Sequence, residues 1–260
     1  RKWSFSGVLL VTGLTALAAF MLLPIVYIFN HAFKPLDELF LFPPRIIVQQ
    51  PTFRNFDSLF FATAGDVVPF TRYLFNSLLI AAVTISCVIM VSTMAGYALS
   101  KLRFGMKSVM MGLIYVSLMF AAETVSIPRY LIISGIGIND TYFAHILPFL
   151  ASPVAVFLMM AFIGQIPNDL IEAAKLDGAS EPAIFRRVVV PLSAPAVATI
   201  SILTFQGVWG DTEASTLFVQ EETMKNLAYY VQTLVNGAQN NVAGQGMLAA
   251  ASLLMFLPNI

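Results

Sequence analysis

Charged side chains are scarce in this sequence. Only 11% of the 260 residues are charged, whereas 58% are hydrophobic and the mean hydropathy is +0.81. An ordinary soluble domain is about 25% charged, and a chain with so few polar groups cannot cover a surface that faces water. The net charge of zero gives no basic surface for nucleic acid. The composition therefore predicts a membrane protein and no nucleic-acid partner.

Cysteine and the short motifs of enzyme active sites are also nearly absent. The single cysteine, Cys87, excludes an internal disulfide and a cysteine-based zinc cluster. No second metal ligand lies at a suitable spacing from His145. The sequence has no nucleophile elbow, no His-Glu-x-x-His and no phosphate-binding glycine loop. We expect no catalytic residue, no metal and no cofactor bound by this chain, so any ATP and Mg that its function requires would bind to other subunits.

What the sequence does have is long apolar runs. A helix needs about 20 apolar residues to cross a bilayer. Six stretches reach or approach that length: Gly7–Phe33, Tyr73–Ser100, Ser108–Ile127, Thr141–Ile163, Val188–Trp209 and Val242–Ile260. Prolines inside them are tolerated because neighbouring helices satisfy the freed carbonyls. We predict an all-α membrane protein with about six transmembrane helices in one domain over residues 1–260.

The distribution of Lys and Arg indicates the orientation of the chain. With the N-terminus in the cytoplasm, segments 1–6, 101–107 and 164–187 would be cytoplasmic and would hold eight basic residues in 37 positions. The external segments would hold six basic residues over roughly twice that length. Because basic residues concentrate on the cytoplasmic side, we predict a cytoplasmic N-terminus. The longest external segments are then 34–72 and 210–241.

One polar segment, 165–187, interrupts the apolar runs. Pro167–Asp169 are typical helix-start residues, and the following "LIEAAKL" predicts a short helix. Gly178 can adopt the left-handed conformation that ends a helix. Ser180–Pro182 then favour the start of a second helix. The segment is predicted to be a cytoplasmic helix, glycine turn and helix.

Two interpretations of this segment stay open on spacing alone. It could lie along the membrane, with Arg186 and Arg187 at the lipid headgroups. Alternatively, the first helix could dock into a groove on a partner protein. A face of small and polar residues would make that contact, and its members are Leu170, Ala173, Ala174 and Asp177.

A wider pattern favours docking. Glu-Ala-Ala at 172–174 is followed after three residues by Gly178, and nine residues later by Val188-x-Val190-Pro191. This pattern resembles the signature loop of bacterial ABC importer permeases, although that family more often has Ile and Leu at the two valine positions. The resemblance implies a coupling helix that contacts an ATPase subunit. The implied coupling residues are Asp169, Glu172, Ala173, Ala174, Asp177, Gly178, Ala179 and Ser180.

Other stretches are similar to the carbohydrate-uptake branch of that family, in particular to MalG-like permeases. These are "NSLLIAAVT" at 76–84 and "AGYALSKLRF" at 95–104. The likeness covers roughly residues 70–215 well and the ends loosely, and we expect the core of the domain to span 70–260. The family commonly has Trp-Asn where this chain has Trp209-Gly210, so any role of that Asn is in doubt.

The resemblance implies a type I ABC importer permease fold in the bacterial plasma (inner) membrane. The partners implied are a second, distinct MalF-like permease, two ATPase subunits and an extracytoplasmic solute-binding protein. Glu172 would make a charge contact with the ATPase, Ala173 and Ala174 would allow close approach, and Gly178 would make the turn. The solute would be a sugar or oligosaccharide. The alternatives are an ABC permease for another solute and an ion-gradient-driven transporter, which would need ionisable residues in several spans and inverted repeats.

Three residues are candidates for the transport pathway. Glu123 is an acid within an apolar span and so a functional candidate; alternatively, it lies at the outer interface and pairs with Arg129. Asn76 belongs to a set of small polar residues that more often pack helices than bind sugars. Trp209, like Tyr97, lies near a span end, which favours interfacial anchoring over stacking on a sugar.

Overall fold

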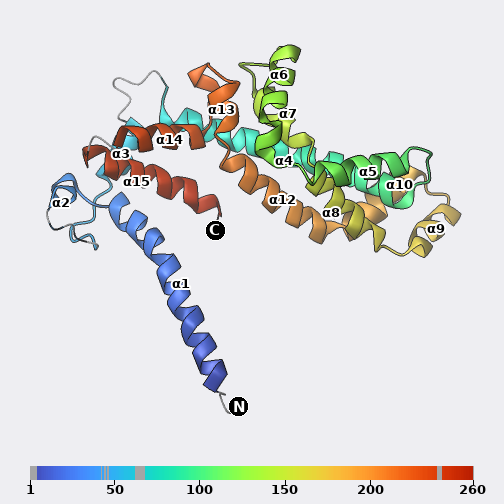
Figure 1. Cartoon of the computed structure of the whole chain (residues 1–260), viewed down its shortest axis with the longest axis horizontal. Helices are drawn as coiled ribbons and strands as arrows, with labels where there is room; N and C mark the ends of the chain where they lie inside the picture. The colour runs from blue at the N-terminus through green and yellow to red at the C-terminus, as the bar shows by residue number, and fades with distance from the viewer. Residues whose placement is uncertain are drawn as a thin grey trace. The chain divides into compact units, whose positions relative to one another are not determined.

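The computed structural model describes residues 5–41, 43, 45, 47–61, 68–238 and 242–259, apart from a few side chains at the margins of helices, among them that of Glu123. All regular elements in these ranges are helices (Figure 1). The chain forms two compact units, one built from Arg1–Arg72 with Leu227–Ile260 and the other from Tyr73–Asn226.

The first unit joins the two ends of the chain. Its helices are α1 (Phe5–Ala32), α2 (Leu36–Leu39), α3 (Arg54–Phe61), α14 (Leu227–Ala238), α15 (Val242–Phe256) and the turn η4 (Leu257–Asn259). Helix α15 contacts α1, α2, α3 and α14, so it is the centre of this unit. None of the most apolar window of α1 is buried within the chain, as expected of a helix whose neighbours are lipid or another protein.

Polar contacts fix the loop that follows α1. Lys34 is 1% exposed, and its ammonium donates to the carbonyl of Arg45. The amide of Asn55 donates to the carbonyls of Ala32 and Lys34 at 2.9 and 2.8 Å. Burial lowers the pKa of the Lys34 ammonium, because the charged form loses hydration. The predicted external segment 34–72 is therefore held by its own hydrogen bonds where the structure describes it.

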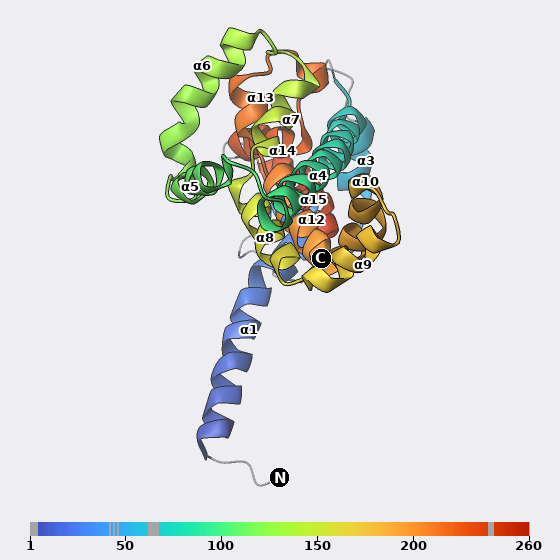
Figure 2. The same cartoon turned by 90° about the vertical axis from the view of Figure 1, so that its right-hand side faces the viewer.

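The second unit begins with a long helix and two shorter ones. Helix α4 (Phe70–Lys101) is followed by α5 (Lys107–Ser117), the 3-10 turn η1 (Ala122–Val125) and α6 (Ser126–Ile136). Helices α5 and α6 meet at a pronounced angle (Figure 2). Helix α7 (Tyr142–Leu150) then leads into α8 (Pro153–Gly164). Helix α8 packs against α5 on one side and against α12 on another.

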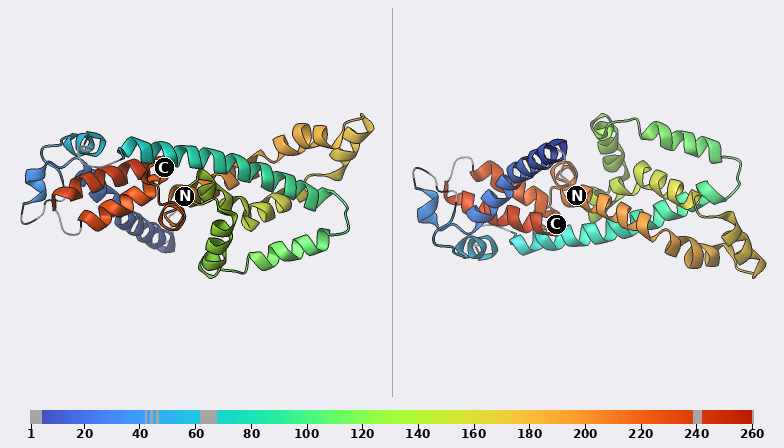
Figure 3. Two further views of the ribbon diagram at one scale, coloured as in Figure 1. Left: turned by 90° about the horizontal axis from the view of Figure 1, so that it is seen from above. Right: turned by 90° about the horizontal axis from the view of Figure 1, so that it is seen from below.

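The remaining elements of this unit form the polar segment and the helices that follow it. They are α9 (Asn168–Leu176), α10 (Glu181–Ile184), the π-helix η2 (Phe185–Val189), α11 (Val190–Leu192), α12 (Ala194–Trp209), α13 (Glu213–Leu217) and η3 (Glu222–Met224). Figure 3 shows α9 and α10 at one end of the unit, beyond the end of α8.

The six predicted spans are only partly seen as continuous helices. Two helices, Gly7–Ala32 and Phe70–Lys101, are long and apolar enough to cross a membrane, and two bent pairs raise that number to four in the described part of the chain. The pair α7 and α8 bends by 44°. The expectation of one helix over Ser108–Ile127 is wrong, because α5 ends at Ser117. Apolar composition alone does not distinguish a straight helix from a broken one.

Helices α4 and α8 approach each other closely at a glycine. A Cβ atom added to Gly96 would lie 2.8 Å from the Cβ of Met159 and 2.9 Å from the backbone nitrogen of Met160. These partners belong to α8, and Met159 is fully buried. Only glycine permits this contact without moving one helix.

We expect Gly96→Ala to destabilise the protein by about 1–3 kcal/mol, because the added methyl group overpacks the contact. Gly112→Ala is the matched control, since nothing lies within 4 Å of the added Cβ there. The control should be neutral or slightly stabilising, as Ala is the better helix former. Thermal unfolding of the purified membrane complex measures both. Equal melting temperatures for the two variants would contradict the close approach.

Candidate functional site

The polar segment folds as a helix, glycine turn and helix. The amide of Ala179 donates to the carbonyl of Ala174, and the amide of Gly178 donates to that of Lys175, both at 3.0 Å. This pair of bonds is the Schellman motif, which places a left-handed residue after the helix. Gly178 is that residue, with φ of +79°. The predicted glycine turn and the start of α10 after Ser180 are both observed.

One face of α9 is exposed. Asp169, Glu172, Ala173 and Asp177 are all exposed, and so are Leu170 at 47% and Leu176 at 90%. Exposed leucines at both ends of a short charged helix are costly in water unless a partner covers them. The other face carries Ile171, which is buried. Helix α9 is thus attached to its own protein by one side and free on the other.

An ion pair and a hydrogen bond join α9, α10 and α4. The Lys175 ammonium lies 2.6 Å from one carboxylate oxygen of Glu181, and the Tyr97 hydroxyl donates to the other at 2.6 Å. Lys175, and then Tyr97, lower the pKa of the Glu181 carboxyl. The two charged side chains are nearly half exposed, so the ion pair itself adds at most about 1 kcal/mol. Tyr97 is buried and supplies the more rigid contact.

Lys101, one turn after Tyr97, holds the other end of the segment. Its ammonium donates to the carbonyls of Gly164 and Ile166 and to the side chain of Asn168, which begins α9. Carbonyls at a helix C-terminus lack partners within the helix, and a cation there also complements the helix dipole. The last turns of α4 therefore contact the first residue of α9, Asn168, and the first residue of α10, Glu181.

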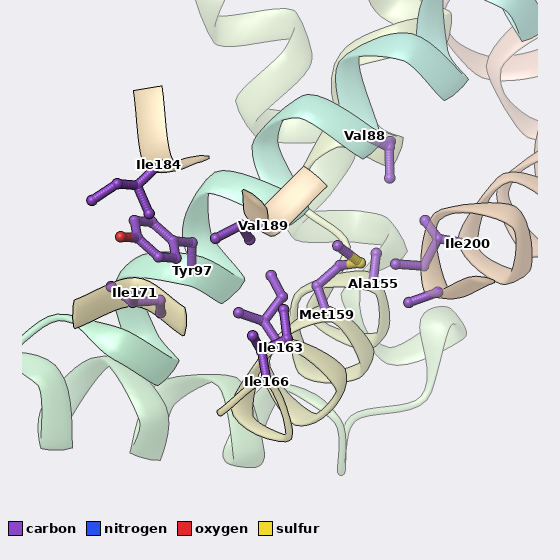
Figure 4. Close-up of a cluster of buried hydrophobic side chains, with 11 residues drawn as sticks. Val88, Tyr97, Ala155, Met159, Ile163, Ile166, Ile171, Ile184, Val189 and Ile200 are labelled. Atoms are coloured by element: carbon purple, nitrogen blue, oxygen red, sulfur yellow. The ribbon is translucent and has the colours of Figure 1, made fainter. Parts of the chain in front are cut away.

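A buried apolar cluster lies under this element. It consists of Val88, Tyr97, Ala155, Met159, Ile163, Ile166, Ile171, Ile184, Val189, Ala196 and Ile200 (Figure 4). Figure 4 shows the Tyr97 ring beside Ile171 of α9 and Ile184 of α10. Ala174 and Ala179 pack against the cluster. The docking face predicted from the sequence is therefore not a single exposed surface, because Ala173 is exposed while Ala174 packs against the protein's own core.

Two pathway candidates lie in buried surroundings. The Asn76 amide donates to the carbonyls of Thr223 and Lys225, and its oxygen accepts from the Tyr142 hydroxyl at 2.8 Å. Both groups of the amide are therefore engaged within the protein. Trp209 is 2% exposed and stacks on Phe205. Neither residue presents a surface to a solute.

Side-chain burial also decides the prediction for the interfacial aromatics, whereas it is not described for Glu123. The expectation that Tyr97 and Trp209 anchor the chain at the membrane surface is wrong, because both are buried. The Glu123 side chain lies outside the described residues. Its suggested partner, Arg129, forms an ion pair with Glu213 at 2.9 Å.

Sequence reasoning missed Tyr97, Lys101 and Glu181 as parts of the site. The first two are four residues apart and so lie on the same side of a helix. The position of Lys101 at the end of an apolar run was a signal in the sequence, because a lysine there either bonds the carbonyls at a helix end or faces the lipid headgroups. Its partners lie 63 to 67 residues later in the chain, and no local pattern identifies them.

Comparison with known proteins places the chain among membrane components of transport systems. A family model described as "Binding-protein-dependent transport system inner membrane component" matches residues 5–260. The trehalose transport system permease protein SugB of Mycobacterium tuberculosis is 35% identical over 199 residues, which are 76% of this chain and 70% of that protein. The arabinooligosaccharides permease AraQ of Bacillus subtilis is 29% identical over 247 residues, 93% and 86% of the two chains.

One solved structure has the same fold. It is the crystal structure of a bacterial ABC transporter involved in the import of the acidic polysaccharide alginate. The match has a TM-score of 0.85 and 22% identity, and it covers 99% of this chain and 95% of the other.

The contacts at α4 predict a local effect of Tyr97→Phe. The variant keeps the ring that packs against Phe185 and removes the hydroxyl that bonds Glu181. We expect amide hydrogen exchange in α10 to accelerate by about tenfold, the value of one hydrogen bond to a charged group. Tyr115→Phe is the control, since its ring also packs on a phenylalanine, Phe157. Equal exchange in α10 for both variants would show that the Tyr97 hydroxyl does not hold it.

Proposed function

Because the chain belongs to the family of binding-protein-dependent transport system inner membrane components, we propose that it forms part of the translocation pathway of an ATP-driven carbohydrate importer. Its relatives SugB and AraQ are named for trehalose and arabinooligosaccharides, which supports a sugar or oligosaccharide. The importer would contain a second permease chain, two ATPase subunits and an extracytoplasmic binding protein. ATP and Mg would bind to the ATPase subunits.

The observation that carries this proposal is the exposed face of α9. Leu170, Glu172 and Leu176 project from a helix whose opposite side is fixed to the core. An amphipathic helix with apolar anchors and a charged rim suits a groove on a partner protein. In this proposal the leucines enter the groove of an ATPase subunit and Glu172 meets a basic residue at its edge.

A rigid attachment is what such a helix needs in order to transmit movement. If α9 were loosely held, the closing of the ATPase subunits would move only the helix. Lys101 bonds Asn168 at the start of α9. Near the other end, Lys175 pairs with Glu181, which the Tyr97 hydroxyl holds, and the apolar cluster fixes the inner face. Packed interfaces respond to displacement as a body, because they are not continuously deformable.

The proposed orientation follows from the same assignment. The N-terminus, the link from α4 to α5, and α9–α10 would lie in the cytoplasm, and α13 and η3 would lie outside. In the assembled importer the chain would make about six crossings, two of them as bent helices. The alternative is an importer for a solute other than a carbohydrate. In that case the residues that contact the solute would have a different role, and the role of α9 would be the same.

We expect Glu172→Arg to reduce both sugar uptake and binding-protein-stimulated ATP hydrolysis by at least tenfold, because reversing a charge at a docked interface costs several kcal/mol. The measurement uses the complete importer in proteoliposomes. The control is Asp37→Arg, which reverses an exposed acid in the first unit. A compensating acid introduced on the ATPase subunit should restore the Glu172→Arg variant. Unchanged ATP hydrolysis in an assembled Glu172→Arg complex would remove the docking role.

A further inference from the structure

A hollow of about 530 Å³ lies in the second unit, away from the coupling site. The break between α7 and α8 forms one wall, and the later half of α12 forms another. Its volume falls within the range of pockets that hold small molecules, about 300–1,000 Å³. The described lining combines apolar groups such as Phe149 with a small set of polar side chains, which are Arg129, Ser152, Thr204, Asp211 and Glu213.

The helix break explains why a hollow exists here. Pro148 and Pro153 flank the break, and the backbone turns by 44°. The Ser152 hydroxyl accepts from the amide of Ala155 and so begins α8. On the facing helix, Gly207 has no side chain, and a Cβ there would lie 3.5 Å from the Phe149 ring. Irregular backbone at membrane depth is stable where it lines a cavity rather than lipid.

The charges around the hollow are unequal in number. Arg129 pairs with one oxygen of Glu213 at 2.9 Å. Asp211 accepts the backbone amides of Glu213 and Ala214, both at 3.3 Å. The described lining thus has two carboxylates and one cation, and that cation is already paired. An anionic group entering the hollow would meet a net negative charge.

A second observation concerns what the hollow lacks. The other oxygen of Glu213, Oε1, is shielded from the surface and has no hydrogen-bond partner among the described residues. A shielded carboxylate oxygen without a donor is energetically costly. A solute hydroxyl therefore reaches Oε1 only when the Glu213 side chain, which lines the hollow and is 33% exposed, turns this oxygen toward the hollow. The hydroxyls of Ser152 and Thr204 line the same space.

We propose that this hollow contacts the solute in transit and selects an uncharged, hydroxyl-rich carbohydrate over an acidic one, an inference that rests on the importer function proposed above. Glu213 turns Oε1 toward the hollow and accepts a sugar hydroxyl there, while Oε2 stays paired with Arg129. Asp211 adds negative charge that repels uronate and phosphate groups. The Phe149 ring supplies an apolar wall for the face of a sugar ring.

The test places a thiol in the hollow. Thr204→Cys, in a Cys87→Ser background that removes the only native cysteine, is made in the complete importer. The rate at which this thiol is labelled is measured with a cationic and with an anionic methanethiosulfonate reagent. Each rate is divided by the rate at which the same reagent reacts with free 2-mercaptoethanol. We expect the cationic reagent to be favoured at least about threefold, because the field of the lining concentrates cations. Glu213→Gln should abolish the preference, whereas Glu221→Gln, at an exposed external acid, should retain it.

A protection experiment then addresses the solute class. A neutral trisaccharide should slow labelling of the thiol at least about threefold at a concentration where a uronic-acid trisaccharide has no effect. Glu213→Ala should remove this protection, since the hydroxyl acceptor is gone. An unreactive thiol, a preference for the anionic reagent, or better protection by the acidic sugar would overturn the proposal.

These outcomes are distinguishable from failure of the importer function. If the chain imports something other than carbohydrate, no sugar stimulates ATP hydrolysis, but the thiol remains reactive with a cationic preference. If only the hollow is assigned wrongly, sugar-stimulated ATP hydrolysis persists while labelling shows no charge preference or no protection.

Discussion

The close contact between α4 and α8 at Gly96 is the constraint on which the placement of the α9–α10 element depends. Because glycine lets the two backbones approach, the next residue, Tyr97, reaches the cluster under α9 and α10. Four residues later, Lys101 reaches the carbonyls that end α8. If α4 stood further from α8, neither contact would form. The position of the exposed face of α9 is therefore set by a packing distance inside the membrane part of the protein.

Helices α8 and α12 connect the α9–α10 element with the hollow. Ala155 and Ile200 belong both to the apolar cluster and to the lining of the hollow. Helix α8 carries the first of these residues and helix α12 the second, and the two helices pack against each other. We expect a displacement of α9 that moves the cluster to change the spacing of the walls of the hollow. This is a continuous packed route between two sites, and no flexible linker interrupts it.

Local rules predicted the elements whose causes are local. The bounds of α9, the left-handed Gly178 and the start of α10 after Ser180 depend on residues within a few positions, and the structure has all three. The break of the third predicted span after Ser117 could not be read from composition, because both halves are apolar. The pairs Tyr97–Glu181 and Arg129–Glu213 each join residues 84 positions apart. Only the fold brings such partners together.

Of the pathway candidates, Asn76 shows why residue type is a weak guide to function in a membrane protein. A polar side chain within an apolar span must find partners, and the cheapest partners are backbone carbonyls of the same protein. Asn76 uses its amide in this way, on carbonyls that precede α14. Glu213 differs from Asn76, because one of its carboxylate oxygens has no hydrogen-bond partner among the described residues and its side chain lines the hollow.

The π-helix η2 accounts for a spacing that an ordinary helix would not allow. Ile184 and Val189 are both buried in the cluster, and they are five residues apart. In an α-helix each residue turns by about 100°, so residues five apart would point about 140° away from each other. In η2 the amide of Val190 donates to the carbonyl of Phe185, five residues earlier, which widens the turn and returns Val189 to the side of Ile184. The widened turn also leaves Arg186 and Arg187 exposed. The link from α10 to α12 therefore gains a second apolar anchor on the cluster, and the two arginines stay at the surface.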